Sequence, residues 1–361
     1  MLVMGEVRTG LLQNSGEIPE SLCQSVLGLL SGERVRVSRR PIVYAVSPDQ
    51  LTGVDCRLAS ASRARVRGVG TVLSRASVTG GRLLQGSSHI RVVRSESDHR
   101  LSWSHYLARP GVVEVFGKVR VPNLAEGFAE NGARDDCLDL GSVSERFMDA
   151  VQASPFLDRK APFRSARTRL RWVAECGGAG STGTGSTSTS TGAGTGTGAG
   201  TGTGAGAGTG TAGGSAAGGG AEIPATGALS PEGPAIRFTL GRDQVRTLRL
   251  VLPGGFTPGV VDFCEDLALH DWLLTTLLVI VERARVGTAT RGEVTAKLAP
   301  AVDHLLHLWM PAARLDEGFA PFWETLERRP GFSRQWQSLV ERVRDQIAIN
   351  TLALLREAGG W

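Results

Sequence analysis

Acidic and imidazole side chains recur in the C-terminal third of the sequence at a spacing that could bind a metal ion. Asp262, Asp266 and His270 are four residues apart, so they share one face of a predicted helix. Imidazoles and carboxylates on facing helices can hold the metal of a hydrolase. The alternative is an ordinary polar face, because acids also favour the first turn of a helix. The candidate ligands, which extend to the next predicted helix, are Asp266, His270, Asp271, His304 and His307.

The His270–Asp271 dipeptide is similar to the one found in metal-dependent phosphohydrolases of the HD type. That family also needs an earlier histidine and a later aspartate on separate helices, and this sequence offers no clear place for either. A metal-dependent hydrolase is therefore the second alternative among the functions, and we expect no cofactor.

Arginines alternate with small apolar residues in the N-terminal half of the sequence. Arg63, Arg65 and Arg67 would point to one face of a strand. A row of guanidinium groups can follow phosphates and would bind a nucleic acid or a phosphorylated ligand in a salt-dependent way. A solvated sheet face is the alternative, since aromatic residues for base stacking are few here. Further along the sequence, the same surface could include Arg82, Arg91 and Arg94.

Other motifs for catalysis are incomplete. Residues 81–88, GRLLQGSS, have the outline of a phosphate-binding loop, but Ser87 stands where that loop needs a lysine. The five cysteines have no CxxC spacing and are expected to be reduced thiols. We see no Ser-His-Asp order and no dinucleotide fingerprint, so enzymatic functions lack an anchor in the sequence.

Composition is that of a globular protein without a membrane span. The chain has 361 residues, 41% of them hydrophobic, and a net charge of +5. This length is enough for about two domains. The longest apolar run, 272–281, is far shorter than the roughly 20 residues that cross a bilayer. With no recognisable signal peptide, we expect a cytoplasmic protein.

A low-complexity tract divides the sequence. Residues 177–221 are only Gly, Ala, Ser and Thr, so they cannot bury an apolar face and are expected to be disordered. We predict an α+β protein, with a β-rich part at residues 1–176 and a helical bundle at residues 257–361. Two alternating segments at 235–252 could return to the sheet of the first part, and the tract would then be a tolerated insertion.

Periodicity predicts the individual elements. Residues 2–12 suit a strand, and residues 18–32 suit a helix that a glycine ends. Short alternating pieces from 58 to 93 predict a meander or, as a minority interpretation, a solenoid-like stack, and residues 111–121 predict another strand. In the C-terminal part, amphipathic patterns predict helices at about 259–285, 291–309, 316–327 and 333–357.

Several stretches resemble an uncharacterised family of actinobacterial proteins. They are GEVRTGLLQNSGEIPESLC (5–23), RVSRRPIVYAVSP (36–48), RVRGVGTVLSRA (65–76), HYLARPGVVEVFGKVR (105–120) and GGFTPGVVDFCEDLALHDWLLTTLL (254–278). The genes of that family neighbour those of a variant P-loop protein and a methyltransferase-like protein. The resemblance implies protein partners from neighbouring genes and supplies no catalytic residues. The leading hypothesis is therefore a non-enzymatic adaptor subunit of a bacterial multi-protein system.

Overall fold

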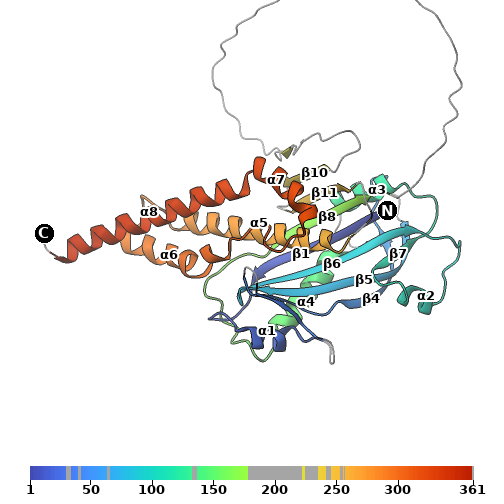
Figure 1. The fold of residues 1–361 in the computed structure, drawn as a ribbon, viewed down its shortest axis with the longest axis horizontal. Helices are drawn as coiled ribbons and strands as arrows, with labels where there is room; N and C mark the ends of the chain where they lie inside the picture. The colour runs from blue at the N-terminus through green and yellow to red at the C-terminus, as the bar shows by residue number, and fades with distance from the viewer. Residues whose placement is uncertain are drawn as a thin grey trace, which may run out of the picture.

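The computed structural model describes residues 1–29, 34–39, 42–62, 66–131, 136–177, 222–223, 235–240, 245–252, 255 and 257–359. In this part of the chain the predicted α+β class is confirmed. A mixed sheet with its covering helices comes first, and a group of helices follows (Figure 1). The tract expected to be disordered lies outside the described residues, apart from Gly177 at its start.

Within the described residues, eleven strands form one sheet. The strands are β1 (Leu2–Leu11), β2 (Arg36–Ser38), β3 (Tyr44–Val46), β4 (Gln50–Leu58), β5 (Val66–Thr79), β6 (Leu83–Arg94), β7 (Val112–Val115), β8 (Thr168–Cys176), β9 (Glu222–Ile223), β10 (Ala235–Leu240) and β11 (Arg246–Leu252). Their spatial order is β2-β3-β5-β7-β6-β1-β8-β11-β10-β9, with β4 also paired to β5. Among the described strands, neighbours pair antiparallel except β6–β7 and β8–β11, which are parallel.

The strand segments at 235–252 lie in the same sheet as the N-terminal strands. Strand β11 runs parallel to β8, with Leu248 opposite Trp172, and β10 follows as the antiparallel neighbour of β11. The amide of Gly177 donates to the carbonyl of Leu252 at 2.8 Å, which joins the ends of β8 and β11. The connection that contains the low-complexity sequence therefore begins and ends in one sheet.

One face of the sheet is covered by α3 (Val121–Asn131) and α4 (Leu140–Gln152), with α1 (Glu20–Leu27) at one end. Successive residues of a strand point to opposite faces. Leu2 and Met4 of β1 accordingly pack with Leu140 of α4 and Phe128 of α3 in one core. A second core beneath α1 and the end of α4 completes this side of the sheet.

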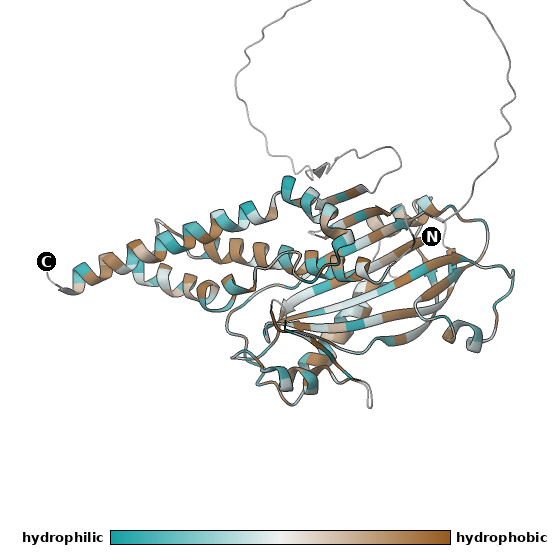
Figure 2. Cartoon of the chain, in the orientation of Figure 1, coloured by the Kyte–Doolittle hydropathy of each residue, from teal (hydrophilic) through white to brown (hydrophobic). Residues whose placement is uncertain are grey.

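The opposite face packs against α5 (Gly259–Arg283) and α7 (Ala320–Arg328), while the short helix α2 (Trp103–Leu107) contacts β5. Val3 and Trp172 of the sheet share a core with Phe263 and Leu267 of α5. Figure 2 shows the brown, hydrophobic residues gathered where the strands meet these helices. A strongly apolar α5 is thus explained by burial on the sheet at one end and in the bundle at the other.

The bundle consists of α5, α6 (Arg291–His304) and α8 (Phe332–Gly359), joined through the 3-10 turns Leu306–Leu308 and Glu317–Phe319. Its core includes Trp272 and Leu277 of α5, Leu298 of α6 and Val343 of α8. Helix α6 begins with a complete capping box between Thr290 and Glu293. Figure 1 shows α8 reaching past α5 and α6 to the far end of the molecule.

Candidate functional site

The first pair of predicted metal ligands is buried between α5 and the segment that follows α6. Asp266 and His270 are both fully buried. The Nδ1–H of His270 donates to the main-chain carbonyl of Asp266 at 2.7 Å, and the rings of Trp309 and Trp323 stand edge-on around the imidazole. The Asp266 carboxylate accepts from the amide of Ala312 at 3.0 Å. These contacts place both residues in a packed helix junction, in which Oδ1 of Asp266 and Nε2 of His270 have no hydrogen-bond partner among the described residues.

The other predicted ligands have different surroundings. Asp271 points away from His270 and pairs with Arg246 at 2.6 Å, while His304 stacks on Phe163. His307 lies 3.3 Å from Glu17 at the surface. Among the described residues, no three His, Cys, Asp or Glu side chains come together as a metal would require. Asp266 and His270 therefore lie together, and the other three candidates do not join them in a metal-binding group among the described residues.

The predicted basic row is spread over the sheet. Arg63 and Arg65 lie outside the described residues. Arg67 forms two hydrogen bonds with Asp55, at 3.0 and 3.2 Å, and Arg91 donates to the carbonyl of Pro110. Arg94 is exposed and stands three residues beyond Arg91, which places it on the opposite face of the strand.

Arg82 is buried in the turn between β5 and β6, next to residues from the metal prediction. Its Nε lies 3.7 Å from Glu17, which also contacts His307. The Nε and Nη1 groups of Arg82 and the Nδ1 of His304 have no hydrogen-bond partner. Burial, and then the charge of Arg82, lower the pKa of His304.

A buried charge cluster that the sequence reasoning missed fixes α5 to the sheet. Arg75 of β5 donates to both carboxylate oxygens of Glu265, at 2.7 and 2.9 Å, and pairs with Asp262. Arg314, whose guanidinium lies 3.9 Å from the centre of the Tyr44 ring, contacts Glu265 from the other side. A charged residue in an otherwise apolar helix face was the only sequence signal for this cluster.

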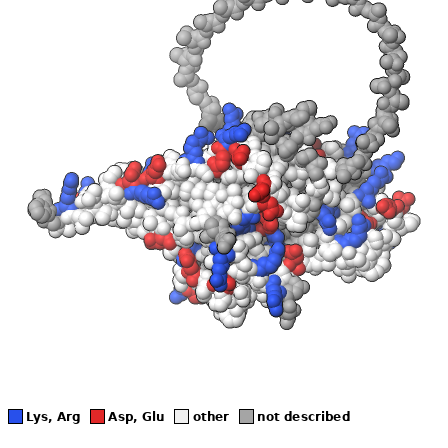
Figure 3. All heavy atoms as spheres, viewed as in Figure 1, with Lys and Arg blue, Asp and Glu red and all other residues white. Residues whose placement is uncertain are grey.

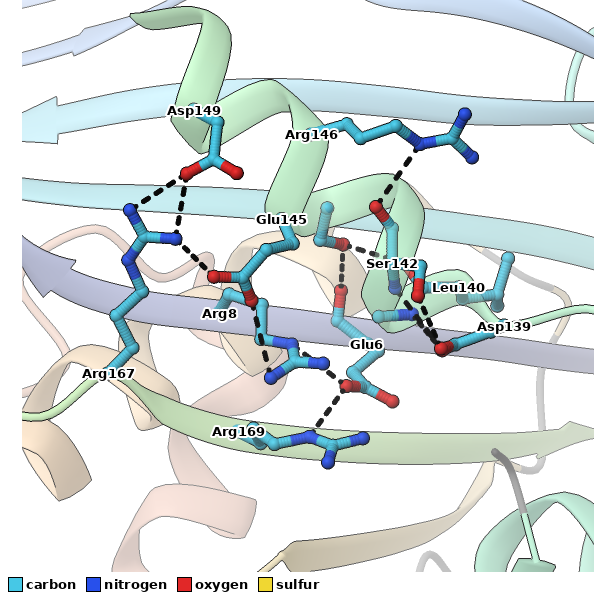
Figure 4. A network of polar contacts seen from close by, with 12 residues as sticks. Glu6, Arg8, Asp139, Leu140, Ser142, Glu145, Arg146, Asp149, Arg167 and Arg169 are labelled. Atoms are coloured by element: carbon cyan, nitrogen blue, oxygen red, sulfur yellow. Dashed lines mark hydrogen bonds and ion pairs between the residues drawn. The ribbon is translucent and has the colours of Figure 1, made fainter. Parts of the chain in front are cut away.

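A second buried network lies beneath the start of α4 (Figure 4). Glu6 of β1 is almost fully buried and is approached by three arginines: Arg8 at 3.1 Å, Arg169 at 3.2 Å and Arg171 at 3.4 Å. Asp139 caps α4 by accepting from the amides at its first turn. Glu145 of α4 adds a third carboxylate, 3.4 Å from Arg8, so the charges balance and we assign the network to the packing of α4 on the sheet.

The most open apolar surface of the described chain lies at the far end of α8. Ile349, Leu352 and Leu355 are 60%, 60% and 62% exposed. Their spacing of three residues places them along one side of the helix. In Figure 3 much of the protruding end of the bundle is white, which means that this part of the visible surface carries no charged side chain. Scattered exposed apolar residues are normal on a protein surface, whereas these three are neighbours on a protruding helix.

A groove of about 550 Å³ lies nearer to the sheet, between β10, α5 and the first turns of α8. Its walls are mostly apolar and include Phe238, Leu274 and Leu339. The groove is within the size range of small-molecule sites.

Comparison with known proteins gives no relative for this chain, since no family model, curated protein or solved structure matches it. Among the described helices, none combines the length and the apolar composition that crossing a membrane requires.

Proposed function

We propose that this protein is a non-enzymatic interaction subunit that binds a helix of a partner protein on the last three turns of α8. The observation that carries the proposal is the exposed row Ile349, Leu352 and Leu355. The same turns also present apolar residues inward, since Ile347 packs on the bundle core. Apolar side chains thus lie both toward the bundle and toward solvent in these turns, so the outward row is expected to be covered by another protein element.

The end of α8 is held in place, which suits a preformed docking surface. Glu357 pairs with Arg291 at the start of α6, and Asn350 is buried between the helices. A surface that is already ordered loses little conformational entropy when a partner binds. An amphipathic helix is the partner of choice, because its apolar residues at helical spacing match a row of this kind.

The proposal is tested with the double variant Ile349→Asp/Leu352→Asp. Both side chains are exposed, so the variant is expected to fold. The wild-type chain, purified from its own cells after nuclease treatment, should carry a partner at near-equal abundance. The amount of partner that co-purifies with the double variant should be at least about tenfold lower, because central apolar contacts dominate such interfaces.

A matched control places the same two charges elsewhere on the helical bundle. Val302→Asp/Gln337→Asp alters exposed positions of α6 and α8 outside the row. This control should retain the partner. If the Ile349→Asp/Leu352→Asp variant keeps the partner as well as the control does, the docking surface is not at the end of α8.

Binding of a nucleic acid or a phosphorylated ligand is a second candidate function, which one observation at α2 favours. Trp103 is 39% exposed, and the guanidinium of Arg100 lies 4.7 Å from the centre of its ring. Arg67 is close by, because Arg67 and Arg100 both contact Asp55, at 3.0 and 3.8 Å. An open aromatic ring beside arginines can stack on a base.

The second candidate is tested by charge reversal. Arg67→Glu/Arg100→Glu should abolish any salt-dependent binding of a single-stranded oligonucleotide, since the phosphates would meet two carboxylates in place of two guanidinium groups. Binding is measured by fluorescence anisotropy at two salt concentrations. Oligonucleotide binding that the reversal leaves unchanged would remove this candidate.

A further inference from the structure

The groove between β10, α5 and α8 combines apolar walls with a polar floor. Phe238, Leu274 and Leu278 line it from the sheet and from α5, and Phe332 and Leu339 line it from α8. Leu278 is 44% exposed although it belongs to the most apolar helix of the chain. An exposed leucine in a concave apolar surface indicates a place that a hydrophobic group can fill.

The floor of the groove carries an ion pair from two elements. Arg246 of β11 contacts Asp271 of α5 at 2.6 Å and donates to the hydroxyl of Thr275 at 2.8 Å. Burial raises the pKa of Asp271 in spite of Arg246, so the pair is costly to desolvate. Perturbed ionisable groups inside a cleft are more frequent at binding sites than elsewhere. The pair contributes no net charge to the groove.

The groove nevertheless has a positive charge at its edge. Arg334 lines it and forms no ion pair with any residue of the described chain. Its guanidinium lies against Gly331, which has a φ of +79°, so a side chain at that position would be both strained and in collision with Arg334. The turn before α8 thus leaves room for the arginine beside the groove.

We infer that this groove binds a small amphiphilic anion, namely a molecule with an unbranched apolar tail and one carboxylate. The tail lies along the apolar walls, and the carboxylate binds the guanidinium of Arg334. A carboxylate matches the fork of an arginine, and a volume of about 550 Å³ accommodates a single small molecule. This site is separate from the partner surface at the end of α8, so each stands without the other.

The inference is tested with decanoate and decanol, which share a tail and differ in the charged group. Isothermal titration of the full chain with decanoate, below the concentration at which it forms micelles, should show one site. Arg334→Gln should weaken decanoate binding about fivefold and leave decanol binding unchanged, because only the carboxylate contacts the arginine. Leu278→Glu should weaken both ligands at least about tenfold by placing a charge in the groove.

Arg342→Gln is the matched control, because this arginine is also exposed on α8 but lies outside the groove. The control should bind decanoate like the wild-type chain. Three results would each overturn the inference: no saturable binding of decanoate, equal weakening by Arg334→Gln and Arg342→Gln, or unchanged binding in Leu278→Glu. Circular dichroism of each variant shows that the fold is retained.

Discussion

At the scale of single residues, a few charged side chains are buried in the core, where charged groups are rare. Arg75 and Glu265 are both buried between β5 and α5, and Arg314 completes the cluster. Burial alone would raise the pKa of Glu265, but Arg75 and then Arg314 outweigh it and hold that pKa below its usual range. The carboxylate is therefore expected to stay charged down to acidic pH and to fix α5 on the sheet.

Glu265→Gln is predicted to lower the free energy of unfolding by about 3–5 kcal/mol, because it leaves the buried Arg314 without a counter-charge and Arg75 with only the partly exposed Asp262. Urea denaturation at neutral pH measures the change. Glu341→Gln, which removes an exposed carboxylate of α8, should stay within about 0.5 kcal/mol of the wild-type value. A loss of less than 1 kcal/mol for Glu265→Gln would show that the cluster contributes little.

His89 predicts a pH dependence of stability. Burial, and then the charge of Arg75, lower its pKa to about 4. The unfolded chain binds a proton at this histidine below about pH 6.5, while the folded chain does not, so stability falls between about pH 6.5 and pH 4. Arg91 and Glu265 also act on this imidazole, in opposite directions.

From pH 7.5 to pH 5 the wild-type chain should lose about 1–2 kcal/mol through His89, measured by urea denaturation at the two values. His89→Gln cannot take up the proton and should show a smaller loss over the same range. The same loss in both proteins would mean that other groups set the pH dependence.

At the scale of helices and strands, a glycine can allow two elements to pack closely together. A side chain at Gly141, in the first turn of α4, would collide with the buried carboxylate of Glu6, whereas a side chain at Gly292, in the first turn of α6, would meet nothing within 4 Å. The two glycines hold similar places in their helices, so they form a matched pair.

Gly141→Ala is predicted to destabilise the chain by about 1–3 kcal/mol, because α4 must move away from β1. Gly292→Ala should be neutral or stabilising by up to about 1 kcal/mol, since alanine is the better helix former. Thermal and urea denaturation compare the two variants. Similar effects for both would show that α4 does not rest on Glu6 as described.

Local sequence patterns predict where helices and strands lie along the chain better than they predict how the strands pair with one another. The strand expected at residues 2–12 is β1, and the helix expected at 333–357 is α8. The strand expected at 111–121 is shorter: only Val112–Val115 pairs, because β7 fits between the ends of β5 and β6. The meander expected from 58 to 93 is mainly one long hairpin, β5–β6.

The candidate sites were harder to predict because their residues are distant in sequence. Arg75 and Glu265 are 190 positions apart, and no periodicity links them. Arg82 and His304 were assigned to different chemistries, yet they interact electrostatically in the fold. The metal prediction placed Asp266, His270 and Asp271 together, but neighbouring helix positions point in different directions.

At the scale of the whole molecule, the described strands form one sheet whose sequence is interrupted by a long connection. Strand β9, which follows the low-complexity tract, lies three strands away from β8. That separation is about 14 Å across the sheet, a distance that a short linker can span. The tract is therefore expected to be dispensable for folding.

Replacing residues 178–221 with a twelve-residue Gly-Ser linker is predicted to raise the free energy of unfolding by about 1 kcal/mol, because the shorter loop costs less closure entropy. Urea denaturation of the two chains checks this value. The partner proposed for α8 should still bind. A loss of more than 2 kcal/mol would assign the tract a structural role.

The central claim is that the end of α8 is a partner surface. The most direct measurement is hydrogen–deuterium exchange, comparing the chain alone with the complex purified from its own cells. Protection should rise in residues 346–359 and change little around α2, because a bound helix would shield the exposed row Ile349, Leu352 and Leu355. Unchanged exchange at the end of α8, with new protection elsewhere in the chain, would contradict the claim.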